Sequence, residues 1–189
     1  MALPGVYDIF NDAWKKYQTI YIISDTHFGE NDLKKAYPNR LSDNEFINKI
    51  NSKMGRKDLL IHLGDVGDLE YIKEIRGDKI LIAGNHESGL EKYKKIFEQV
   101  YAGPLMIGEK ILLSHEPILN CPWVYNCHGH VHNPHAKDDV YHFNFNVDSK
   151  QHYEPWNFNQ WLKEGHTAQI QSLHRQTIDT ATERKESRK

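Results

Sequence analysis

Five short apolar runs in the chain each end in a polar cluster that contains Asp, Asn or His. The runs are rich in Ile, Leu and Val, which is typical of buried strands. In open α/β sheets, side chains just beyond the carboxyl ends of the strands meet in one crevice. The pattern therefore predicts that the clusters converge on a single site, with the members Asp25, His27, Asp65, Asn85, His86, His115, His130 and His132.

Helical patterns alternate with these runs. Ser42 and Glu45 form a capping box that opens a helix, which we expect to end near Met54. Shorter helices are expected over about 69–75 and 90–99. Strands are expected over 19–24, 58–63, 79–83, 110–114, 123–127 and 141–147. Strands that alternate with helices predict an α/β fold with largely buried strands.

The two ends of the chain differ from this central pattern. Apolar residues recur at helical spacing over about 6–17, which predicts an amphipathic N-terminal helix. The apolar pattern weakens after Gly165, and the last residues are a mixed charge run. A length of 189 residues suits one domain. We therefore expect a single domain over 1–165, followed by a charged tail over 166–189 that is helical or flexible.

Composition narrows the class of protein. Charged residues make up 26% and the formal net charge is −2, which weighs against tight, sequence-independent binding of duplex DNA. No apolar run approaches the ~20 residues of a membrane span, and no signal-peptide pattern opens the chain. With only two cysteines, a disulfide framework is not expected. These features predict a cytoplasmic protein that is a monomer or a small homo-oligomer.

The candidate ligands outnumber the positions around one tetrahedral ion. Asp25, His27, Asp65, Asn85, His115, His130 and His132 supply seven side chains, about the number that two ions with a bridging carboxylate need. The mixture of carboxylate and imidazole suits manganese, our expected metal, or iron, nickel or zinc. Each cluster alone has an ordinary structural explanation. A single zinc bound by Cys127 and nearby histidines is a further alternative, but it leaves the other clusters unexplained.

The order Asp-x-His, Gly-Asp, Gly-Asn-His-Glu, His and Gly-His-x-His resembles the calcineurin-like metallophosphoesterase superfamily. The match runs roughly from Thr19 to Val147, and the chain is similar in size to small prokaryotic or phage-type members without a cap domain. The resemblance implies a two-sheet sandwich flanked by helices, in the layer order αββα. It also implies a dinuclear metal site at the strand ends.

The resemblance further implies a role for each matching residue. One metal would be held by Asp25, His27 and His132, the other by Asn85, His115 and His130, and Asp65 would bridge the two. His86 would face the substrate as the general acid. Apart from the resemblance, two neighbouring residues are candidates for support: Glu87 to orient His86 or a metal-bound water, and His128, which precedes the ligand pair His130 and His132.

This arrangement predicts a divalent-metal-dependent phosphoesterase. A metal-bridging hydroxide would attack the phosphorus, and His86 would protonate the leaving oxygen. The absence of a cap favours a phosphodiester over a phosphomonoester, with a small nucleotide or a nucleic-acid end as the candidate substrate. Two alternatives stay open: a nuclease component of a complex, docked through the N-terminal helix, and a catalytically silent scaffold of the same fold.

Overall fold

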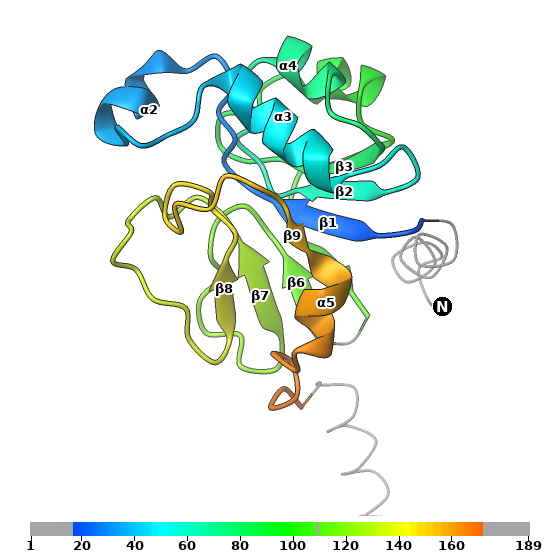
Figure 1. Cartoon of the computed structure of the whole chain (residues 1–189). Coiled ribbons are helices and arrows are strands. Elements are labelled where there is room, and N and C mark those ends of the chain that lie inside the picture. Colours follow the sequence, from blue (N-terminus) through cyan, green and yellow to red (C-terminus); the bar gives the residue numbers. More distant parts are fainter. Residues whose placement is uncertain (1–16, 109, 172–189) are drawn as a thin grey trace, which may run out of the picture.

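The computed structural model describes residues 17–108 and 110–171 of the chain. They form two mixed β-sheets with helices around them (Figure 1). The first sheet has the strand order β4-β3-β2-β1-β9 and the second has the order β5-β6-β7-β8. An α/β fold with two facing sheets confirms the expected fold class.

The first sheet is parallel except at one edge. Its parallel strands are β1 (Ile20–Ile23), β2 (Leu59–His62), β3 (Asp78–Ile82) and β4 (Gln99–Tyr101), and β9 (Trp156–Asn157) runs antiparallel to β1. In the second sheet β6 (Ile111–Leu113), β7 (Tyr125–His128) and β8 (His142–Asn144) are parallel, and β5 (Leu105–Ile107) is antiparallel to β6. The helices are α2 (Asn31–Ala36), α3 (Asp43–Lys53), α4 (Leu69–Lys73), α5 (Phe158–Lys163) and the 3₁₀ helix η1 (Leu90–Lys95).

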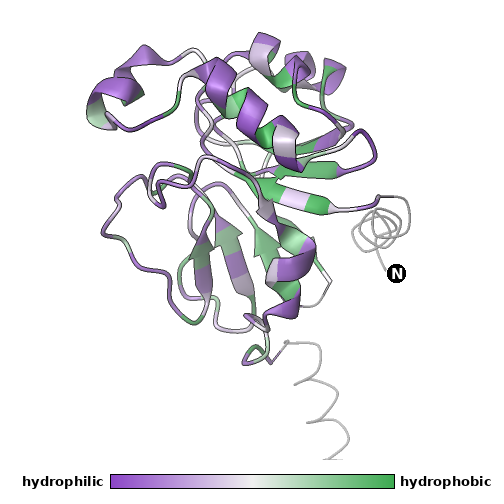
Figure 2. Ribbon diagram, viewed as in Figure 1, coloured by the Kyte–Doolittle hydropathy of each residue, from purple (hydrophilic) through white to green (hydrophobic). Residues whose placement is uncertain are grey.

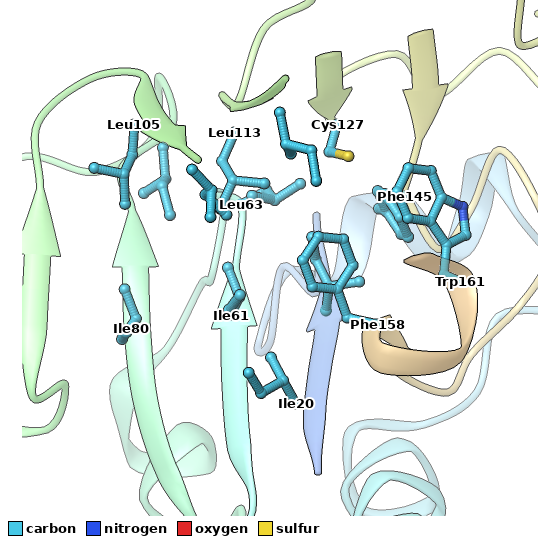
Figure 3. Close-up of a cluster of buried hydrophobic side chains, with 14 of the residues drawn as sticks. Ile20, Ile61, Leu63, Ile80, Leu105, Leu113, Cys127, Phe145, Phe158 and Trp161 are labelled. Atoms are coloured by element: carbon cyan, nitrogen blue, oxygen red, sulfur yellow. The ribbon is translucent and has the colours of Figure 1, made fainter. Parts of the chain in front are cut away.

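The larger core lies between the two sheets. Successive side chains of a strand point to opposite faces, so Ile61 of β2 points into this core, as Ile80 of β3 does (Figure 3). Leu113 and Cys127 enter from the second sheet, and α5 adds Trp161. Burial of each large apolar side chain contributes about 1.5–3 kcal/mol, which makes this interior the main source of stability.

A second core lies on the outer face of the first sheet. There Leu60 of β2 and Leu81 of β3 pack against apolar side chains of α3 and α4. Hydrophilic and apolar residues alternate along these helices (Figure 2), and the exposed residues are polar or charged. The capping box of Ser42 and Glu45 is present at the start of α3, as expected. Buried residues on both faces explain why these strands are continuous apolar runs in the sequence.

The carboxyl ends of the parallel strands in both sheets meet at one edge. β1, β2 and β3 lead into the loops that carry Asp25, Asp65 and Asn85. β6 and β7 lead into His115 and His130. An isolated parallel bridge between Ser24 and Asn146 joins the two sheets at this edge.

The sequence did not predict all elements correctly. The helix expected over 90–99 is wrong, because only η1 forms there and Gln99 already begins β4. The strand is favoured because its backbone pairs with β3, while Tyr93 and Phe97 turn into the second core. β5, β9 and the helices α2 and α5 were not anticipated.

The expected N-terminal helix over 6–17 lies almost wholly outside the described residues, as does most of the tail over 166–189. The domain boundary near residue 165 therefore stays a prediction. Within 17–108 and 110–171, no helix has the length and apolar character that a bilayer span requires.

Candidate metal centre

The strand ends bring the predicted ligands into two adjacent clusters. Asp25, His27 and His132 offer ligand atoms that all lie within 4.8 Å of one another, and Asp65, His115 and His130 do the same. The Oδ1 atom of Asn85 completes the second group, 2.9 Å from His115 Nε2 and 3.1 Å from His130 Nδ1. We call these the first and the second cluster. All seven predicted ligands therefore meet, grouped as the resemblance implied; that they bind metal stays a prediction.

Asp65 lies between the two clusters. Its Oδ2 atom is 3.5 Å from His27 Nε2 in the first cluster and 3.3 Å from His115 Nε2 in the second. His86 is beside it, with Nε2 3.9 Å from the same oxygen and the backbone N–H donating to Asp65 Oδ1. The side chain of His86 is half exposed, whereas Asp65 is buried. One carboxylate thus touches both clusters and fixes the position of the proposed general acid.

Three of the imidazoles are oriented by an acceptor behind them. Nδ1 of His27 lies 3.0 Å from Glu30 Oε2, Nδ1 of His132 lies 3.1 Å from Asp148 Oδ2, and Nδ1 of His115 lies 2.8 Å from the Leu63 carbonyl. Carboxylates and carbonyls accept, so the proton sits on Nδ1 and the Nε2 atoms face the clusters. Such orientation is typical of histidines that bind metals.

The carboxylates make this edge strongly negative. Burial opposes ionisation of Asp65, but hydrogen bonding and the charge of His115 lower its pKa to about 2. Burial likewise opposes ionisation of Asp25, and the hydrogen bond from His132 holds its pKa below the usual value. Burial disfavours a charged His132, yet Asp148 and Asp25 raise its pKa to about 9. Both carboxylates are therefore ionised at neutral pH, and their field favours a cation between them.

The backbone is strained at the same residues. Asp25, His27, Asp65 and His130 have φ angles of 61°, 41°, 55° and 63°. Such values are uncommon outside glycine and cost of order 1–3 kcal/mol each. Four of the six non-glycine residues with positive φ in the described segments are thus proposed ligands. This concentration indicates that the loops are held for function rather than for stability.

The backbone at Gly129 lies so close to Ser24 and Asp25 that only glycine fits there. A Cβ atom at Gly129 would clash with Ser24 Oγ and Asp25 Oδ2. Without one, the next residue comes near enough for the His130 backbone N–H to donate to Asp25 Oδ2 at 2.9 Å. The Gly of the Gly-His-x-His motif therefore joins the two sheets at the site.

The two predicted supporting residues behave differently. Glu87 accepts from the backbone amides of Asp65, Val66 and Gly84, so it ties two ligand loops together rather than orienting His86. His128 is buried in β7 and its Nδ1 lies 2.8 Å from the Gly129 carbonyl. It therefore supports the Gly129 loop through the backbone.

Three residues behind the first cluster escaped the sequence analysis: Glu30, Arg40 and Asp148. Arg40 is buried, forms an ion pair with Asp148 and donates to the Thr26 carbonyl. Asp148 follows an apolar run, as the other clusters do, so the same strand-end pattern contained a signal for it. Glu30 lies three residues after His27 in a polar loop, and nothing in the pattern singles it out.

The donor set fits divalent metal ions. His27 Nε2 is buried and has no hydrogen-bond partner in the described chain, although it faces two carboxylates. A buried, unsatisfied nitrogen is costly unless another group completes its bonding. By contrast, burial raises the pKa of the Cys127 thiol, and none of the possible metal clusters among the described residues includes it. This argues against the zinc alternative.

Two facing mixed sheets with His and Asp clusters at the strand ends define the metallophosphoesterase type of α/β architecture. Residues 18–186 match the family model described as calcineurin-like phosphoesterase, so the chain belongs to this family. Its members are typically metal-dependent phosphoesterases, and the clusters are consistent with metal binding of that kind.

Two relatives are similar over much of their length. The uncharacterized protein MJ1445 of Methanocaldococcus jannaschii is 31% identical over 137 residues, covering 63% of this chain and 72% of the relative. The crystal structure of AQ665, a protein of unknown function from Aquifex aeolicus, superposes with a TM-score of 0.63 at 26% identity. That match covers 77% of this chain and 98% of the other.

Proposed function

We propose that this protein hydrolyses phosphate esters, with a preference for nucleotide-like phosphodiesters, using two divalent ions. The observation that carries the proposal is the position of Asp65 Oδ2, within 3.5 Å of a ligand nitrogen in each cluster. One carboxylate so placed suits two neighbouring cations.

The proposed first ion is held by Asp25, His27 and His132, and the second by Asn85, His115 and His130. Divalent ions here would supply a nucleophile at neutral pH and offset charge on the phosphoryl oxygens. The chain prepares the site by keeping both aspartates ionised and by directing the Nε2 atoms of three imidazoles inward, those of His27, His115 and His132. We propose manganese as the metal, since the ligands mix carboxylate and imidazole, with iron, nickel or zinc as alternatives.

His86 is the proposed general acid. Its imidazole is half exposed and lies beside Asp65, so a phosphate ester that enters the clusters from solvent can contact it. Nδ1 of His86 lies 3.9 Å from Glu30 Oε1, so a carboxylate lies on the side of the ring away from Asp65. The ring would transfer its proton from Nε2 to the leaving oxygen as the ester bond breaks.

The test is hydrolysis of bis-p-nitrophenyl phosphate and p-nitrophenyl phosphate by metal-stripped protein, with manganese, nickel, zinc or magnesium added back. Metal-dependent release of p-nitrophenol supports the proposal, and the faster substrate separates diesterase from monoesterase. If two ions bind and neither these esters nor dinucleotides are cleaved, the scaffold alternative holds instead.

A variant tests the role of His86. His86→Ala should keep the metal stoichiometry and lose about 10²–10⁴-fold in turnover of a dinucleotide, whose alkoxide leaving group needs a proton. The loss should be smaller for p-nitrophenyl esters, because p-nitrophenolate leaves without protonation. The matched control is His135→Ala, an exposed histidine outside both clusters. Equal losses for both kinds of leaving group would remove His86 from the general-acid role.

A further inference from the structure

A cavity of about 360 Å³ opens beside the second cluster. Its lining comes from three segments, residues 83–85, 102–104 and 114–118, which follow β3, β4 and β6. Asn85 and His115 belong both to this lining and to the second cluster. The cavity therefore continues directly from the proposed site of chemistry, and its volume falls in the range of small-molecule sites, about 300–1,000 Å³.

His86 borders the first cluster instead. Its ring centroid is 5.0 Å from that of His27, and its Nδ1 atom faces Glu30. Neither His86 nor any member of the first cluster is among the residues that line the cavity. A leaving oxygen that takes a proton from His86 lies on the His27 side. The cavity is then left for the group that stays on the phosphorus.

The lining has few groups that could bind a second phosphate. Among its residues there is no Lys or Arg, and most are small or apolar. Glu116 is exposed, and its carboxylate forms no ion pair or side-chain hydrogen bond with another residue of 17–108 or 110–171. An unpaired carboxylate repels a phosphoryl oxyanion and accepts hydrogen bonds from hydroxyl or amino groups.

We propose that this cavity is the subsite for the retained ester group of a phosphodiester, and that it takes a neutral or cationic alcohol. The inference rests on the proposed function and gives it a physical basis for diester preference. A monoester has no retained alcohol group, so it leaves the cavity empty and gains no contact with its lining.

Two esters with the same leaving group and different retained groups test whether the cavity binds the retained group. Bis-p-nitrophenyl phosphate and methyl p-nitrophenyl phosphate both release p-nitrophenolate and differ only in the retained group. A Cβ at Gly103 meets nothing within 4 Å, and its φ is outside the left-handed region, so Gly103→Leu should fold and fill the cavity. The kcat/KM ratio of the bulky to the methyl ester should then fall about tenfold or more.

Gly55→Leu is the matched control for bulk. Gly55 is exposed, lies outside the cavity, and its Cβ would make only an ordinary contact with Asp58. A melting curve of each variant checks folding. If Gly103→Leu does not fold, Gly103→Ala carries the test, with a smaller fall in the same ratio.

Charge provides the second test. Glu116→Lys should raise kcat/KM for p-nitrophenyl phosphate relative to the diesters several-fold, and Glu116→Gln should have an intermediate effect. Glu74→Lys makes the same change of net charge at the end of α4 and should leave the ratio alone.

The outcomes separate the inference from the proposed function. If both diesters are hydrolysed but neither kcat/KM ratio changes in Gly103→Leu or Glu116→Lys, the subsite is refuted and the proposed function is not affected. No hydrolysis of any ester by the wild-type protein with two ions bound would overturn both.

Discussion

The two clusters differ in what supports their ligands from behind. In the first cluster, His27 and His132 each have a carboxylate on Nδ1, from Glu30 and Asp148. In the second cluster, His115 has only the Leu63 carbonyl, while Asn85 and His130 are exposed. The first cluster is thus less exposed and has charged groups behind it, and the second is more open and adjoins the cavity.

This difference predicts unequal metal affinity. A carboxylate behind an imidazole raises its basicity and fixes its orientation, so it strengthens metal binding. Exposed ligands pay more side-chain entropy when they are ordered. We therefore expect the first cluster to bind its ion more tightly, and the second cluster to release its ion first on chelation. The tight site would anchor the substrate, and the open one would accommodate its variable part.

The largest effect is expected at Asp65, which both clusters share. Asp65→Asn removes the negative charge near His27 and His115, so both ions should bind more weakly and hydrolysis should fall by more than 100-fold. Calorimetric metal titration and turnover measure this. Asp68→Asn is the control, because Asp68 caps α4 and Asn caps nearly as well. Loss of one ion alone would refute the shared role.

Removing one ligand from each cluster should separate the two ions. His132→Ala should abolish tight binding, whereas His130→Ala should leave the tight ion and lose the weaker one. Metal content after dialysis against a mild chelator distinguishes these cases. The comparison fails if both variants lose the same ion or if both keep two.

Replacing a carboxylate that contacts Nδ1 of a ligand histidine should weaken metal binding less than removing the ligand itself. Asp148→Asn keeps the size of the side chain but removes the carboxylate from His132, and should cost about 10–100-fold in affinity at the tight site only. Glu30→Gln should act in the same direction through His27. An equal loss at both sites would mean that these residues act on the fold rather than on one cluster.

The smallest effect on metal binding is expected at His62, which lies beneath both clusters. Its Nε2 atom contacts Thr26 Oγ1 at 2.9 Å, and Gly64 N–H donates to Nδ1. Burial lowers the pKa of His62 to about 3. In the unfolded chain the pKa of this histidine is ~6.5. The neutral His62 therefore contributes its full share to the free energy of unfolding above pH ~6.5, and this share is lost as the pH falls toward 3.

His62→Gln removes this titration. The difference in free energy of unfolding between wild type and His62→Gln should therefore shrink from about pH 7 to about pH 4. Denaturant unfolding at a series of pH values measures it in the metal-free proteins. A difference that grows toward acid pH would contradict the assignment.

The convergence of the proposed ligands was predictable because continuous apolar runs mark the buried strands and parallel strands place their carboxyl ends at one edge. Asp25, Asp65 and Asn85 follow strands that are buried on both faces, and such strands are unmistakable in the sequence. Arg40 and Glu30 come from the loop around α2, whose position depends on tertiary contacts. The wrong helix prediction over 90–99 likewise reflects tertiary contacts, since pairing of Gln99–Tyr101 with β3 overrides local helical spacing.

The most direct measurement is a titration of metal-stripped protein with manganese, followed by calorimetry and by electron paramagnetic resonance. The account predicts two ions per chain with unequal affinities, and a spin-coupled signal once the second site fills. One ion per chain, or two ions without coupling, would contradict a shared dinuclear centre at Asp65.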